Sequence, residues 1–255
     1  MENIAAINPL TEDPMAATPR VPGRINDRRL YILAAILTPL IVLAGFARTY
    51  YLKPFFNTPD LPGRIVHLHG IVMTSWVVLF VVQVSLVATR RTRLHQRLGI
   101  LGGVLAALVV IVGTLTALFA AARGATPGPP ALAFLVIPLG DMLVFSVLIG
   151  LALYFRRKLH VHKRLMLLAA INLLTPAIAR IPLSFIINGG PLAFFGLTDL
   201  CLLACVVFDT FKHRRLHPVF LWGSIFIIAT QPLRLLLAST DGWMKFAAAL
   251  VSLVQ

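Results

Sequence analysis

The chain has 255 residues, of which 58% are apolar and only 13% are charged, and its mean hydropathy is +0.88. Soluble domains usually carry about 25% charged residues, so this composition excludes a water-soluble surface. Repeated apolar stretches, each near the roughly 20 residues that cross a bilayer, predict an all-α, polytopic transmembrane helical bundle.

The positive charge of the chain is concentrated between the apolar stretches. The formal net charge is +14, and 16 of the 23 Lys and Arg residues fall in four clusters, at 20–29, 90–97, 156–164 and 212–215. These clusters flank alternate ends of the stretches, so the positive-inside rule predicts a cytoplasmic N-terminus. The charge therefore indicates attraction to anionic lipid at the cytoplasmic face, and no binding of nucleic acid.

The predicted elements follow one another in three parts. Residues 1–29 contain Pro9, Pro14 and Pro19 without apolar periodicity and are predicted to form a disordered cytoplasmic tail. Residues 30–238 are predicted to form a transmembrane domain of about seven helices, and residues 239–255 an interfacial helix on the outer side. The predicted spans cover 30–51, 65–88, 98–121, 131–155, 165–187, 193–211 and 218–238, and the outer turns 54–62, 126–130 and 188–191.

Two basic segments resemble each other. Arg-Arg-Thr-Arg-Leu-His-Gln-Arg-Leu at 90–98 is similar to Arg-Arg-Lys-Leu-His-Val-His-Lys-Arg-Leu at 156–165. Both are predicted cytoplasmic turns, and a parallel repeat of helix hairpins would relate spans two and three to spans four and five. The alternative is that cytoplasmic loops independently accumulate Arg, Lys and His.

Ionisable and large polar side chains within the spans are candidates for function, because burying them in a bilayer is costly. Asp141 and Arg180 are predicted to lie at similar depths in the outer half, where they could pair. The alternatives are ion pairs that only fix helix register, and a polar cavity for a ligand, ion or cofactor. The predicted polar groups of the outer half are Arg48, His67, His69, Asp141, Arg180, Asp199, Gln231 and Arg234.

The second span carries a polar stripe. His69, Trp76 and Gln83 are seven residues apart, so they share one face of a helix that drifts only about 20° per heptad. His67 and His69 could together chelate a metal ion only on extended backbone, because residues i and i+2 lie about 200° apart on a helix. His69 alone could be a ligand or a hydrogen-bonding group.

Two histidines of the cytoplasmic side are candidate cofactor ligands. His95 and His162 each precede a span at equivalent places of the two similar segments, and neutral imidazole is a usual axial ligand of haem iron. Arg97, Lys163 and Arg164 could balance haem propionates. The candidate cofactor is a haem b or a metal ion.

The run His162-Lys-Arg-Leu-Met166, with Arg180 after it, resembles a signature of poorly characterised bacterial multi-pass membrane families, one of them linked to cytochrome c oxidase assembly. The stretch Leu68-His-Gly-Ile-Val-Met-Thr-Ser-Trp76, with Gln83 and His95-Gln-Arg-Leu-Gly99, is similar to the same proteins. The resemblance spans about residues 48 to 182 and implies His69, His95, His162 and Arg180 as site residues.

A weaker similarity is to diheme transmembrane b-type cytochromes, whose helices supply two histidines in each leaflet. Here His67 and His69, the outer histidines, belong to a single span, so an outer haem bridging two helices is not available.

The sequence therefore predicts an inner (cytoplasmic) membrane protein with a polar cavity in its outer half, active in respiratory or haem- and metal-linked membrane biology through assembly, cofactor handling or electron transfer. One alternative is a proton- or ion-coupled transporter or small-molecule binder without a prosthetic group. Another is a structural accessory subunit of a membrane complex. Partnership with another membrane protein or with a second copy of the chain stays open.

Overall fold

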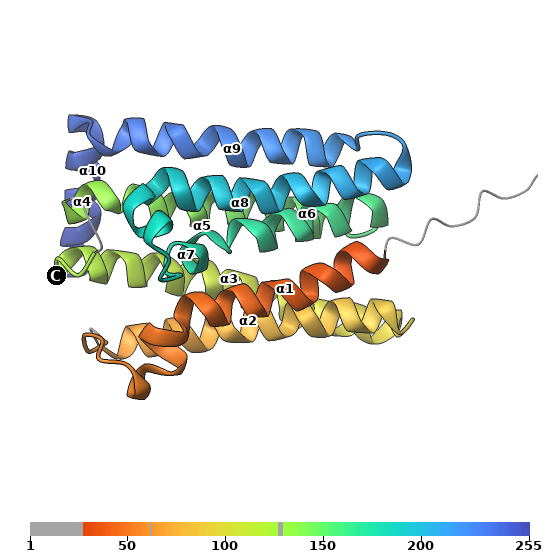
Figure 1. The fold of residues 1–255 in the computed structure, drawn as a ribbon, viewed down its shortest axis with the longest axis horizontal. Helices are drawn as coiled ribbons and strands as arrows, with labels where there is room; N and C mark the ends of the chain where they lie inside the picture. Colours follow the sequence, from red (N-terminus) through yellow and green to blue (C-terminus); the bar gives the residue numbers. More distant parts are fainter. Residues whose placement is uncertain (1–27, 62, 127–129) are drawn as a thin grey trace, which may run out of the picture.

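The structure is a computed structural model that describes residues 28–61, 63–126 and 130–255. Seven of its helical segments are long and apolar enough to cross a membrane, and they run side by side along the long axis of the molecule (Figure 1). The protein is therefore an all-α, multi-pass membrane protein with seven spans, as the composition predicted. The predicted N-terminal tail lies, as far as residue 27, outside the described residues.

The seven spans are built from helices of different lengths. Several of them are interrupted, so that one span contains a short helix followed or preceded by a longer one. The elements are α1 (Arg28–Phe46), the π-helical turn η1 (Ala47–Tyr51), η2 (Lys53–Phe55), α2 (Arg64–Ala88), α3 (Thr92–Ala122), α4 (Ala131–Phe134), α5 (Val136–Tyr154), α6 (Leu159–Asn172), α7 (Thr175–Ile178), α8 (Ser184–His213), α9 (Pro218–Ala238) and α10 (Asp241–Ser252).

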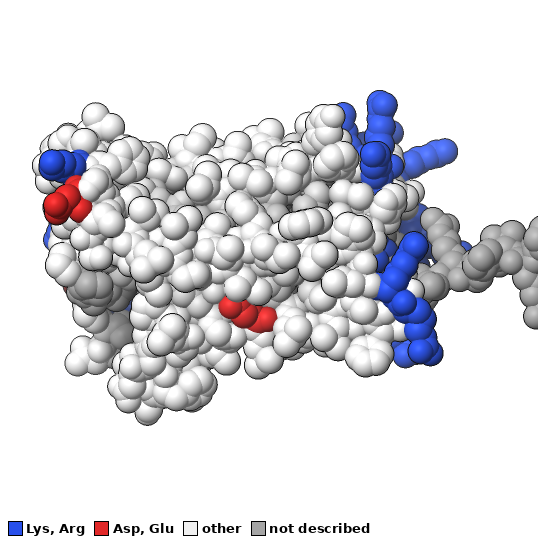
Figure 2. All heavy atoms as spheres, turned by 90° about the horizontal axis from the view of Figure 1, so that it is seen from above, with Lys and Arg blue, Asp and Glu red and all other residues white. Residues whose placement is uncertain are grey.

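The two ends of the bundle differ in charge. On the face shown in Figure 2, most Lys and Arg side chains gather at the end where α1 begins, and the wall between the two ends is nearly free of them. We call this end the basic end; α2 turns into α3 there, α5 into α6, and α8 into α9. We call the other end, where α4 and α10 lie, the opposite end (Figure 1).

The break between spans five and six differs from the prediction. Span five was expected to reach residue 187 and to turn at 188–191, but α7 ends at Ile178 and the chain turns at 179–183. Residues 188–191 instead form a kink within α8, where Gly190 has a φ of 52°. Proline has no N–H to donate and a glycine tolerates positive φ, so Gly190 and Pro191 bend this helix without ending it.

The core lies where α5 and α6 pack together. Most of the fifth span is buried, and Phe145 and Leu148 of α5 and Leu168 of α6 are almost fully enclosed. Trp76 of α2 meets Phe145 edge to face, with ring centroids 5.2 Å apart. This geometry adds about 0.5–1.5 kcal/mol to the burial of two aromatic rings.

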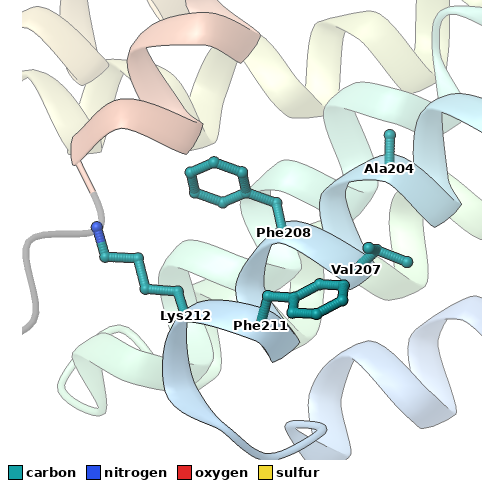
Figure 3. A pocket seen from close by; sticks show the side chains of 5 residues that line it. All are labelled: Ala204, Val207, Phe208, Phe211 and Lys212. Atoms are coloured by element: carbon teal, nitrogen blue, oxygen red, sulfur yellow. The ribbon is translucent and has the colours of Figure 1, made fainter.

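The outer wall is apolar, as contact with lipid requires. Ile100 and Leu192 are more than three-quarters exposed, at 77% and 79%. A shallow open groove on α8 is lined by Ala204, Val207, Phe208, Phe211 and Lys212 (Figure 3). None of the candidate site residues lines it, so we assign it to the lipid-facing wall.

The segment predicted to be an interfacial helix contains α10. This helix lies across the opposite end of the bundle (Figure 1). Ala247 and Val251 are buried against Leu118 of α3 and Leu135 beside α4. The indole Nε1–H of Trp243 donates a hydrogen bond to the carbonyl oxygen of Leu132 over 2.8 Å.

Candidate functional site

His95 and His162 lie side by side at the basic end. His95 is near the start of α3 and His162 near the start of α6, and both side chains are partly buried. Their ring centroids are 6.4 Å apart, and the ring planes cross at 73°. The structure therefore brings together the two histidines that occupy equivalent places in the two similar basic segments.

Hydrogen bonds give the two rings opposite tautomers. The side-chain amide of Gln83 fits its neighbours when Nε2 donates to His95 Nδ1 over 2.6 Å and Oε1 accepts from the Gly99 N–H over 3.2 Å. A neutral His95 then carries its proton on Nε2. His162 Nδ1 is 2.8 Å from the Ala152 carbonyl oxygen, which can only accept. A neutral His162 therefore donates from Nδ1 and keeps a lone pair on Nε2.

Arg164 is held by an ion pair inside the protein. Its Nε and Nη2 donate to the two carboxylate oxygens of Asp209 in α8 over 2.8 to 3.1 Å, and its Nη1 donates to the His160 carbonyl oxygen over 2.8 Å. Both side chains are buried. Asp209 thus neutralises the charge of Arg164, which was expected from the sequence to help bind a cofactor.

Two further histidines stand close to this ion pair. The rings of His160 and His217 have centroids 5.6 Å apart. His217 Nδ1 accepts a hydrogen bond from the Val219 N–H over 3.2 Å and so caps α9. Burial, and after it the positive charge of Arg164, lowers the pKa of His217 to about 4. His217 is accordingly neutral at pH 7 and able to accept this bond.

Toward the opposite end, Asp141 is paired with Arg234 and not with Arg180. The guanidinium Nη1 of Arg234 in α9 donates to Asp141 Oδ1 over 2.6 Å, and both side chains are buried. Arg234 also donates from Nη2 to Thr230 Oγ1 over 3.2 Å, and Asn172 Nδ2 donates to the Asp141 carbonyl oxygen over 3.1 Å. The predicted Asp141–Arg180 pair is wrong because α9, and not the α7–α8 turn, presents a cation to this face of α5.

A second polar contact joins α8 to α9 in the same half. Gln231 Nε2 donates to Asp199 Oδ1 over 2.7 Å; Gln231 is buried and Asp199 is partly exposed. Thr175 and Thr198 share a hydrogen bond of 3.1 Å. Arg48, which was placed in the same cluster, is exposed, and its guanidinium lies 5.4 Å from the centroid of the Phe56 ring.

The polar stripe of α2 faces the bundle along its length. Trp76 packs in the core, Gln83 reaches His95, and His69 Nδ1 is buried without a hydrogen-bond partner. His67 is exposed and lies 6.1 Å from the Tyr50 ring centroid. Both histidines lie on helical backbone, which directs them to opposite sides and disfavours a joint chelate. In the described ranges, no group of three or more His, Cys, Asp or Glu side chains could hold a metal ion.

Two partners of the charged groups were not predicted. Asp209 is one of only nine acidic residues and stands in an apolar run, four residues before His213. Such a carboxylate is a signal for a buried cation on a neighbouring helix, since a buried charge must be paired. Asn172 gave no comparable signal, because a single amide within a span also occurs in packing contacts.

Comparisons with family models, with curated proteins and with solved structures gave no match for this chain.

Proposed function

We propose that this protein resides in a bacterial inner (cytoplasmic) membrane, with its N-terminus in the cytoplasm, and holds a haem b or a metal ion between His95 and His162. Its role is in respiratory or haem- and metal-linked membrane biology, through assembly, cofactor handling or electron transfer. One observation carries the proposal: two imidazoles from separate helices lie side by side with ring centroids 6.4 Å apart.

That separation would allow both imidazoles to bind one metal. An imidazole nitrogen binds a first-row metal at about 2 Å, and the ring centroid lies about 1 Å further, so two such rings have centroids roughly 6 Å apart. The observed 6.4 Å agrees with this value. His95 and His162 would therefore hold a haem or a metal ion, because imidazole is a usual ligand of both.

The surroundings of the two rings also fit such a group. Metal-binding histidines usually donate their other ring N–H to a carbonyl or carboxylate, as His162 does to Ala152. A Cβ at Gly99, one turn after His95 on α3, would meet no atom within 4 Å, so there is space on that face. Arg97 and Lys163 supply positive charge for propionates at this end. A bound haem or metal would supply one-electron transfer or a deliverable ion.

Ligation requires a rearrangement at His95. Its Nε2 must carry a lone pair to bind a metal, so the ring proton must move to Nδ1. The Gln83 amide must then turn its oxygen toward that ring. Gln83 is therefore a positioning residue for this site.

The visible spectrum and the metal content of the purified, full-length protein test the proposal. A haem predicts a Soret band that shifts on reduction with dithionite, and a metal ion predicts about one equivalent by elemental analysis. His95→Ala and His162→Ala should each remove the signal. His67→Gln, which changes an exposed histidine at the opposite end, should retain it.

A folded wild-type protein that carries neither haem nor metal after expression with both supplied would contradict the proposal. Retention of the full signal in both His95→Ala and His162→Ala would contradict it equally, because the ligands would then lie elsewhere.

A second candidate is a proton- or ion-coupled transporter that uses a polar cavity in the outer half. Asp199 supports it, because a partly exposed carboxyl in a span is costly unless it serves binding or transfer, and its side-chain partner is a neutral amide. Proteoliposomes containing a pH-sensitive dye would report proton uptake. Loss of uptake in Asp199→Asn, with no visible spectrum in the wild type, would favour this candidate.

A further inference from the structure

A second polar site lies where α1 ends, α2 begins and α7 turns into α8. The guanidinium of Arg180, in that turn, lies 5.0 Å from the centroid of the Phe46 ring at the end of α1. Arg180 also interacts electrostatically with His69 of α2. Gly45 is in backbone contact with Ala177 of α7. Three segments that are distant in the sequence therefore meet at Arg180.

Buried polar atoms at this junction have no partner within the protein. His69 Nδ1 and Thr49 Oγ1 are both buried, and neither makes a hydrogen bond with the described residues. The two segments that carry them are in contact, because Tyr50 Oη donates to the His67 carbonyl oxygen over 3.3 Å and the Tyr50 ring fills the space beside Gly70. Buried polar groups in proteins nearly always have partners, so these two atoms are available to a water molecule or a ligand.

The charge of the junction indicates the sign of that ligand. Arg180 Nη1 donates to the Pro176 carbonyl oxygen over 2.8 Å, but in the described part of the chain no carboxylate forms an ion pair with Arg180. Two buried carboxylates already have other partners: Asp141 pairs with Arg234, and Asp209 pairs with Arg164. Arg48, in the neighbouring π-helical turn, adds a further positive charge.

The surroundings indicate an amphiphile. In Figure 1, α7 does not reach the end of the bundle where α4 and α10 lie. The turn that follows α7 therefore lies between that opposite end and the middle of the bundle. Leu183, Phe185 and Ile187, which follow Arg180, are exposed apolar side chains. A ligand with an anionic oxygen head and an apolar tail would match both the positive charge of Arg180 and the exposed apolar side chains that follow it.

We infer that Arg180 and His69 form a binding site for the phosphate group of an anionic lipid in the leaflet at the opposite end. Arg180 donates charge-assisted hydrogen bonds to the phosphate oxygens, and His69 donates from Nδ1. The acyl chain lies along the start of α8. Free phosphate offers the same oxygens without the tail.

The test uses the full-length protein in a neutral detergent, titrated with a short-chain phosphatidylglycerol, and follows binding by native mass spectrometry. We expect Arg180→Gln to weaken binding at least tenfold and His69→Gln to weaken it several-fold. Arg64→Gln, which removes an exposed cation at the start of α2, should leave the affinity within about twofold.

Three results would overturn the inference. One is an unchanged affinity in His69→Gln, which decides the matter even where Arg180→Gln does not fold. Another is equal binding of phosphatidylglycerol and a zwitterionic phosphatidylcholine. The third is complete displacement of the lipid by an equal concentration of inorganic phosphate, which would show that the tail contributes nothing.

Discussion

Arg164 and Asp209 form a bidentate ion pair that joins α6 to α8 at the basic end, with the shortest N–O distance at 2.8 Å. Both side chains are buried, so neither charge has water as an alternative partner. The pair fixes the register of the most buried span against one of its neighbours, and removing either charge leaves the other uncompensated.

Replacing Asp209 should therefore destabilise the fold strongly. Asp209→Ala leaves Arg164 buried and unpaired, which costs about 3–5 kcal/mol. For a protein of this size we expect the Tm in detergent to fall by roughly 10 °C. Asp60→Asn is the matched control, because Asp60 is an exposed partner of Lys53 and such pairs contribute about 0–1 kcal/mol. A Tm for Asp209→Ala equal to that of the control would refute the prediction.

The Asp141–Arg234 pair permits a double-mutant test. Asp141→Leu and Arg234→Met should each lower the free energy of unfolding by about 3–5 kcal/mol, because each leaves one buried charge. The double variant leaves none and should be more stable than the less stable single variant. Thermal unfolding in detergent measures all four proteins. If the stability losses of the two single variants simply add in the double variant, the two side chains do not interact.

Gly140 stands against Arg234 and should not tolerate a side chain. A Cβ at Gly140 would collide with the Arg234 guanidinium, whose position is set by Asp141. We expect Gly140→Ala to cost about 1–3 kcal/mol through overpacking. Gly150→Ala on the same helix is the control, because no atom lies within 4 Å of its added Cβ. There the substitution should be neutral or stabilising by up to about 1 kcal/mol.

His217 should make stability depend on pH. Its pKa is lowered to about 4 in the folded protein, so between about pH 6.5 and pH 4 the unfolded chain binds more protons at this residue. The contribution of His217 to the free energy of unfolding is therefore fully present above about pH 6.5 and declines as the pH falls toward 4. Protonation of Nδ1 also removes the acceptor that caps α9 at Val219.

The test compares the Tm of wild type and His217→Asn between pH 7 and pH 4.5. Asparagine can cap the helix but does not titrate. The decline in Tm on acidification should be smaller in the variant; an equal decline would assign it to other groups.

The spans could be predicted from the sequence because membrane insertion depends on the length and polarity of each segment. Interruptions within spans depend on packing between helices, so they were harder to predict from the sequence. The turn at 179–183 is an example: Asn188-Gly-Gly-Pro191 is a stronger turn sequence, yet it forms a kink inside α8. Span five can end early because α7 packs against α1, where the backbone of Ala177 lies close to Gly45.

The partners of the charged residues were predictable only in part. Counting residues gives the depth of a side chain along a helix, and it placed Asp141 and Arg180 at similar depths. It does not give the face of the bundle, so it could not distinguish Arg180 from Arg234 as the partner of Asp141. His95 and His162 could be paired from the sequence, because they occupy equivalent places in two similar segments.

The hydrogen bond from Trp243 to Leu132 has a consequence for biosynthesis. The two residues are 111 positions apart, so the ribosome makes all seven spans before Trp243 exists. During that interval the start of α4 lacks the indole that later holds its carbonyl group. The opposite end of the bundle can therefore assume its final form only after all seven spans have been synthesised. Truncation before α10 should consequently yield a protein that inserts normally but is cleaved by protease near Leu132.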